Sequence, residues 1–233
     1  MSTISAIVPV YNEEKTIDHV LKTLVNSDVF YEVICVNDGS TDSSAIEIKK
    51  NKKVQLVNCK VNRGKGNALS LGIKKATGDF VALVDADLSK LNIGHIKKMV
   101  EPVINESGVD VVIAYEDGEF LSLFSGQRIY KRAELLALLT EMKKSKFGVE
   151  ALLNSAFNNK TVKYIQLQGL GHIEKIQKIE SKDVMPSYLK HWFVDVLKQC
   201  LKSGVTYSQF KIALDEMPKF ISNKSKKYKT KSK

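Results

Sequence analysis

The chain has 233 residues, of which 43% are hydrophobic, and this length is sufficient for one α/β domain with a full core. Its net charge of +10 is unevenly distributed, because residues 219–233 hold seven lysines and no acidic residue, and the remainder carries only +3. A nearly balanced body with a lysine-rich end is typical of a globular enzyme rather than of a nucleic-acid-binding module. We therefore expect a folded domain over 1–217 and a basic flexible tail over 218–233.

Apolar runs and cysteines bear on the location of the protein. Runs such as 80–84 are far shorter than the roughly 20 residues of a membrane span, and no charged leader precedes an apolar stretch at the N-terminus. The three cysteines form no C-x-x-C pair, which indicates a reduced, cytoplasmic protein. For the tail, a solvated end and peripheral contact with an anionic membrane both stay open, since each lysine at such a surface contributes about 1 kcal/mol.

In chain order, short β-branched runs alternate with helical patterns. The runs predict strands over 4–10, 32–36, 54–57, 79–84 and 109–114, and apolar residues at helical spacing predict helices near 17–24, 68–76 and 93–103. This alternation is typical of a mostly parallel, Rossmann-like sheet flanked by helices. Further along we expect a polar loop at 125–128, a helix over 133–142, another opening at 147–150, a strand over 162–167 and an amphipathic C-terminal helix over 186–201.

Polar residues follow the predicted parallel strands where their apolar patterns stop. Because ligands bind beyond the carboxyl ends of such strands, we expect these loops to form one site. Asp85 and Asp87 stand at i and i+2 just past the fourth strand, so that both carboxylates can converge on a divalent cation such as Mg²⁺ or Mn²⁺. Taken alone, this acidic pair is also compatible with a turn or a helix cap.

Four segments in order resemble the successive signatures of glycosyltransferase family 2: IVPVYNEE at 7–14, VNDGSTD at 36–42, NRGKGNAL at 62–69 and DADL at 85–88. The resemblance is close over residues 4 to 115 and loose beyond. It implies a GT-A fold, in the α/β class, and an enzyme that uses a nucleotide-diphosphate sugar as donor. The third segment is no dinucleotide fingerprint, because Leu69 replaces the third glycine.

The resemblance also implies a role for single residues of the donor side. Pro9 and Tyr11 would line the nucleotide pocket, with Glu13 accepting hydrogen bonds from the ribose or base, although Glu13 also suits the first turn of a helix. Asp38 would read the base or its ribose, or else cap the next helix. The remaining donor-side residues would surround the diphosphate and its metal ion, and they are Arg63, Lys65, Asp85 and Ala86.

On the acceptor side, the segments SGQR at 125–128 and FGVE at 147–150 resemble the family's acceptor region. They assign acceptor contacts to Gln127 and Arg128, and Glu150 becomes the candidate general base, with an ordinary helix acid as the alternative. His172, in a glycine-flanked loop, resembles the histidine that completes the metal shell with Asp85 and Asp87 in some GT-A enzymes, or it is a solvated loop residue.

The expected reaction is metal-dependent transfer of a sugar from a nucleotide-diphosphate sugar, first of all a UDP-sugar, to a hydroxyl acceptor with inversion. The acceptor is open among a saccharide, a lipid-linked molecule and a small molecule. Transfer to a polyprenyl phosphate at the membrane surface is the second reading, and a non-catalytic basic binding module is the third. The sequence leaves the oligomeric state undefined.

Overall fold

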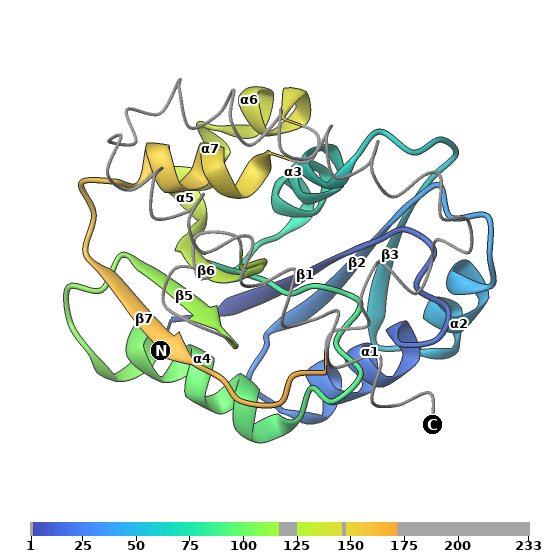
Figure 1. Cartoon of the computed structure of the whole chain (residues 1–233), viewed down its shortest axis with the longest axis horizontal. Helices are drawn as coiled ribbons and strands as arrows, with labels where there is room; N and C mark the ends of the chain where they lie inside the picture. The colour runs from blue at the N-terminus through green and yellow to red at the C-terminus, as the bar shows by residue number, and fades with distance from the viewer. Residues whose placement is uncertain (1, 117–124, 146–147, 172–233) are drawn as a thin grey trace, which may run out of the picture.

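The computed structural model describes residues 2–116, 125–145 and 148–171. Within them, a seven-stranded sheet of order β3-β2-β1-β4-β6-β5-β7 is covered by helices on both faces, as predicted (Figure 1). No helix of the described part is both long and apolar enough to cross a bilayer. The predicted helix over 186–201, the boundary at 217 and 218 and the basic tail lie outside the described residues.

The first half of the chain builds the parallel part of the sheet. Inward-pointing side chains alternate along the first strand, where Ala6 and Val8 join one core cluster and Ile7 joins the other, so both sheet faces are buried. The four strands pair in parallel, and they are β1 (Ile4–Val10), β2 (Glu32–Asp38), β3 (Val54–Cys59) and β4 (Phe80–Leu83). Because all four run the same way, the loops after them meet at one edge.

Two groups of helices cover the two faces (Figure 1). One core cluster lies beneath α1 (Ile17–Asn26), α2 (Ser44–Lys50) and α4 (Ile93–Asn105). The other lies beneath α3 (Lys65–Lys75), α5 (Arg132–Leu136), α6 (Leu139–Lys144) and α7 (Val149–Ala156). The α3 and α7 helices thus stand on the same side of the sheet, and each begins with residues that the sequence assigns to the site.

The second half of the sheet departs from the sequence prediction in one place. The last two residues of the polar loop predicted over 125–128, together with residues 129–131, form β6 (Gln127–Lys131), which runs antiparallel between β4 and β5 (Val111–Tyr115). Ile129 and Tyr130 are buried there, and the helix predicted over 133–142 is divided into α5 and α6. The first two residues of β6, Gln127 and Arg128, are polar but buried, so the sequence lacks the apolar pattern that would predict a strand here. The strand predicted over 162–167 is present as β7 (Val162–Gln166), and it pairs in parallel with β5.

Candidate active site

The acidic triplet lies directly after β4, at the edge where the parallel strands end. Ala86 is only 4% exposed and packs in the core, so Asp85 and Asp87 on either side of it point away from that core. Both aspartates are partly buried. Burial therefore alternates along this triplet, and two residues with hard oxygen donors flank Ala86 at the edge of the sheet.

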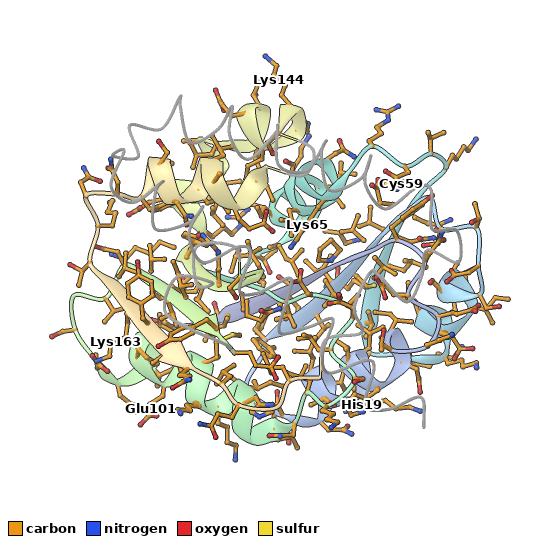
Figure 2. The ribbon with its side chains drawn as sticks, in the orientation of Figure 1. His19, Cys59, Lys65, Glu101, Lys144 and Lys163 are labelled. Atoms are coloured by element: carbon orange, nitrogen blue, oxygen red, sulfur yellow. The ribbon has the colours of Figure 1, made fainter. Side chains whose placement is uncertain are left out.

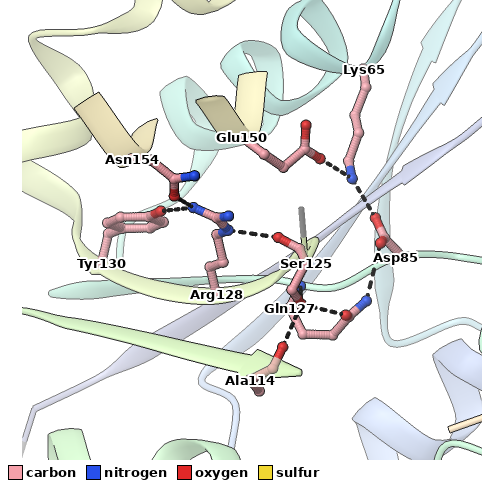
Figure 3. Close-up of polar contacts among 9 residues, drawn as sticks. All are labelled: Lys65, Asp85, Ala114, Ser125, Gln127, Arg128, Tyr130, Glu150 and Asn154. Atoms are coloured by element: carbon pink, nitrogen blue, oxygen red, sulfur yellow. Dashed lines mark hydrogen bonds and ion pairs between the residues drawn. The ribbon is translucent and has the colours of Figure 1, made fainter. Parts of the chain in front are cut away.

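Lys65 joins the triplet to the candidate base. Its Nζ lies 2.7 Å from Oδ1 of Asp85 and 2.6 Å from Oε1 of Glu150, and each of the three side chains is less than a quarter exposed (Figure 3). Burial by itself lowers the pKa of Lys65, but the two carboxylates outweigh burial and hold this pKa above its ordinary value. Residues 65, 85 and 150, far apart in the sequence, thus form one chain of ion pairs, which we call the Lys65 bridge.

Gln127 and Gly126 fix the other side of Asp85. The Nε2 of Gln127 donates to Oδ2 of Asp85 at 3.1 Å, and Oγ of Ser125 lies 2.9 Å from the side-chain oxygen of Gln127 (Figure 3). A Cβ placed on Gly126 would stand 2.1 Å from Oδ2 of Asp85. Lys65 therefore holds one oxygen of the Asp85 carboxylate and Gln127 holds the other. Only glycine at position 126 leaves enough space for the carboxylate in this place.

Gly126→Ala is expected to displace the Asp85 carboxylate and to lower kcat/KM about tenfold or more, with a loss of roughly 1–3 kcal/mol in the free energy of unfolding from overpacking. Gly94→Ala on α4 is the matched control, because a Cβ there meets only the side-chain oxygen of Asn92 at 3.1 Å. Kinetics and chemical denaturation of both variants make the comparison. Equal behaviour of the two variants would show that the Asp85 position does not matter.

Arg128 lies in the interior behind these residues. It is 1% exposed, and its Nε donates to the carbonyl of Ser125 at 2.6 Å while one terminal nitrogen donates to Asn154 Oδ1 at 2.6 Å and to the Tyr130 hydroxyl at 3.1 Å (Figure 3). These bonds tie β6 to α7, the helix that carries Glu150. The predicted acceptor contacts of Gln127 and Arg128 stay predictions, and the contacts described here are positioning contacts within the protein.

The donor-side residues predicted from the first two segments follow β1 and β2. Tyr11 is 46% exposed, Pro9 is partly buried, and the amide of Glu13 donates to the Ser44 hydroxyl at 2.8 Å. These contacts place the β1 loop beside the start of α2. The nucleotide contacts predicted for these residues stay predictions.

Asp38 is turned inward, toward the loop before α3. It is 3% exposed and accepts the backbone N–H groups of Arg63, at 3.1 Å, and Gly64, at 2.7 Å. Burial raises the pKa of Asp38, and the two N–H groups oppose that rise. Gly39 follows with φ of 75°, and a Cβ there would lie 2.6 Å from the nitrogen of Asn62. In this structure Asp38 therefore anchors the loop that leads to Lys65.

A family model described as "Glycosyl transferase family 2" matches residues 5–165. The match covers all strands of the described sheet, except the first residue of β1, Ile4, and the last residue of β7, Gln166. The chain belongs to glycosyl transferase family 2. The family predicted from the four sequence segments is thereby confirmed.

Curated members of the family align with part of the chain. An uncharacterized glycosyltransferase of Synechocystis is 32% identical over 154 residues, which are 60% of this chain and 46% of that protein. A poly-beta-1,6-N-acetyl-D-glucosamine synthase of Staphylococcus epidermidis is 41% identical over 88 residues, 36% of this chain and 21% of that protein. The chain thus spans less than half the length of these curated relatives.

Solved structures confirm the fold. Glucosyl-3-phosphoglycerate synthase from Mycobacterium tuberculosis, in a complex with Mn²⁺, UDP-glucose and phosphoglyceric acid, superposes with a TM-score of 0.68 at 22% identity, over 85% of this chain and 80% of the other. The predicted GT-A fold of this family 2 chain is thus correct.

The metal ligands predicted for this family 2 chain are only partly described. His172 lies outside the described residues, and the described residues alone contain no group of three or more His, Cys, Asp or Glu side chains that could hold an ion. The last described residue, Gly171, accepts hydrogen bonds through its carbonyl from the amide and hydroxyl of Ser89, at 3.0 and 2.6 Å. The described chain therefore ends beside residues that closely follow Asp87.

The contacts that hold this site together could not be predicted from the sequence. Lys65 is predicted beside a diphosphate, but its pairing with Glu150 is a contact between residues 85 positions apart. Asn154 and Tyr130, which hold Arg128, receive no role from the sequence. Asn154 stands four residues after Glu150, one helical turn along α7, and this spacing is the only sequence signal for its place in the site.

Proposed function

We propose that this family 2 protein transfers a sugar from a nucleotide-diphosphate sugar, with a UDP-sugar as first candidate, to an acceptor hydroxyl with inversion. The observation that carries the proposal is the Lys65 bridge, which brings the acidic triplet, a partly buried cation and a second carboxylate into one cluster. The named complexes of the Mycobacterium tuberculosis enzyme with Mn²⁺ and UDP-glucose support the choice of donor and metal.

Glu150 is proposed as the general base. In the transfer, the acceptor oxygen forms a bond to the anomeric carbon, the bond from that carbon to the diphosphate oxygen breaks, and the diphosphate departs with the electron pair. The acceptor proton passes to the Glu150 carboxylate, a contribution of about 10²- to 10⁴-fold. Glu150 stands at the start of α7, and its Oε1 forms an ion pair with the Nζ of Lys65, so the carboxylate lies beside a fixed cation.

Lys65 is proposed to stabilise the departing diphosphate. It is the first residue of α3, so a diphosphate that reaches it also meets the positive end of this helix. Fixed positive charge directed at a group on which negative charge develops is among the largest contributions to catalysis. Arg63, two residues earlier, remains the second proposed diphosphate contact.

The donor set at the edge of β4 fits a hard divalent cation. Asp87, with Asp85 and the proposed third ligand His172, would hold Mn²⁺ or Mg²⁺, and the bound ion supplies positive charge for the diphosphate. Lys65 and Gln127 each contact one oxygen of Asp85, and these two contacts orient its carboxylate at the edge of the sheet. Pro9, Tyr11, Glu13 and Asp38 remain the proposed nucleotide side of the site.

Asp87→Ala is expected to remove the stabilisation by UDP that depends on Mn²⁺. In the wild type, a nucleotide at 100 times its dissociation constant stabilises the fold by about 2.7 kcal/mol. A thermal-shift screen of UDP-, GDP- and dTDP-sugars with and without Mn²⁺ measures this, with Glu101→Ala on the exposed side of α4 as the control. Full retention of Mn²⁺-linked binding by Asp87→Ala would contradict the assignment.

A further inference from the structure

A pocket lies beside α3, between the end of β3 and α6. It has a volume of about 420 Å³, within the range of small-molecule sites. Three of its lining residues are cations from two segments: Lys60 and Arg63 in the loop between β3 and α3, and Lys143 on α6. Apolar and amide groups complete the lining, among them Val61, Leu71 and Asn67.

The charged residues that line this pocket are all positive. None of its lining residues is acidic, and among the described residues no carboxylate forms an ion pair with Lys60, Arg63 or Lys143. Three like charges that face one cavity repel one another, and an anion placed between them removes that repulsion. Phosphate suits such a site, because its several oxygens accept from lysine and arginine at once.

The pocket opens on the side of α3 away from the Lys65 bridge. Asn67 and Leu71 are four residues apart and share one face of the helix. Lys65 stands two residues before Asn67, about 200° around the helix axis from it at roughly 100° per residue. Figure 2 labels Cys59, which lines the pocket at the end of β3, and Lys65, which points into the molecule.

We propose that this pocket is a second ligand site, which binds a small phosphate-bearing molecule. Its phosphate lies among Lys60, Arg63 and Lys143, and its apolar part rests on Val61 and Leu71. Val61 is 63% exposed, and an apolar ligand group on it removes this surface from water. The site adjoins the proposed donor site, because Arg63 is also a proposed diphosphate contact, whereas Lys60 and Lys143 have no role in the donor site.

Cys59 gives a local measurement in the full chain. Alkylation of Cys59 by iodoacetamide, followed by peptide mass spectrometry, reports whether the pocket is covered, and the other described cysteine, Cys35, is buried. The probe is phenyl phosphate. Inorganic phosphate and phenol, which represent its anionic and its apolar part, are tested separately for comparison. At ten times its dissociation constant phenyl phosphate leaves about a tenth of the sites open, so alkylation is expected to slow about tenfold.

Lys60→Gln with Lys143→Gln is expected to remove this protection. The matched control is Lys52→Gln with Lys53→Gln, which removes the same number of charges directly before the start of β3. This control is expected to keep the protection of Cys59. Inorganic phosphate is expected to protect more weakly than phenyl phosphate, and phenol not at all. Protection that is absent, or equal in the two double variants, overturns the proposal. Protection of Cys59 by UDP with Mn²⁺ in place of phenyl phosphate also overturns it, because the pocket then belongs to the donor site.

Discussion

Glu150→Gln is expected to slow transfer to a hydroxyl acceptor by about 10²-fold or more, which is about 2.7 kcal/mol of transition-state stabilisation. The amide keeps the size of the side chain but accepts no proton. Nucleotide-sugar affinity is expected to stay unchanged, so donor binding and catalysis separate. Single-turnover rates and a donor titration measure the two effects.

The pH profile gives an independent check of the same residue. The wild-type rate should fall at low pH as the base is protonated, and this limb should be absent in Glu150→Gln. Glu141→Gln, an exposed carboxylate on α6, is the control and should keep both the rate and the limb. An unchanged rate in Glu150→Gln would remove Glu150 from the mechanism and favour an acceptor, such as a polyprenyl phosphate, that needs no base.

Lys65→Met is expected to lower kcat/KM by about 10²- to 10³-fold, the cost of losing one fixed group that stabilises developing negative charge. The variant also leaves Asp85 and Glu150 without their shared cation. Because these side chains are largely buried, we expect the free energy of unfolding to fall by a few kcal/mol. Steady-state kinetics and urea denaturation measure the two losses.

The pH dependence of this destabilisation follows from the raised pKa of Lys65. A lysine whose pKa is raised by folding contributes its stability fully below its unfolded pKa of about 10.4, and loses it as the pH rises through the higher folded value. The difference between wild type and Lys65→Met should therefore be the same at pH 7 and pH 9. Lys74→Met, exposed in the last turn of α3, is the control and should be near wild type in both assays. A Lys65→Met protein with normal activity would contradict the role of the bridge.

The parallel half of the fold is predictable because its rules are local. Buried parallel strands read as short apolar runs, and helices between them show their own spacing, so β1 to β4 are found to within two residues at each end. The alternating burial of Asp85, Ala86 and Asp87 follows from the same short-range pattern. The acidic edge of the sheet follows from strand direction alone.

The antiparallel strand β6 is not predictable in this way. Its first two residues are polar and buried, and they are satisfied by partners in other elements: Gln127 by Asp85 after β4, and Arg128 by Asn154 on α7. Such compensation depends on long-range contacts that a periodicity does not encode. Asp38 gives a second example, since its partners are backbone N–H groups of the loop before α3.

We propose that the cluster around the Lys65 bridge breaks the bond between a sugar and a nucleoside diphosphate. The most direct measurement is the rate at which the full chain releases UDP from UDP-sugars, with Mn²⁺ and with a chelator. Water serves as acceptor where no other is present, so the measurement does not need the natural acceptor. We predict release that requires Mn²⁺ and falls strongly in Lys65→Met. Sugar nucleotides that bind the protein but are never cleaved, under any acceptor or metal tested, would contradict the account.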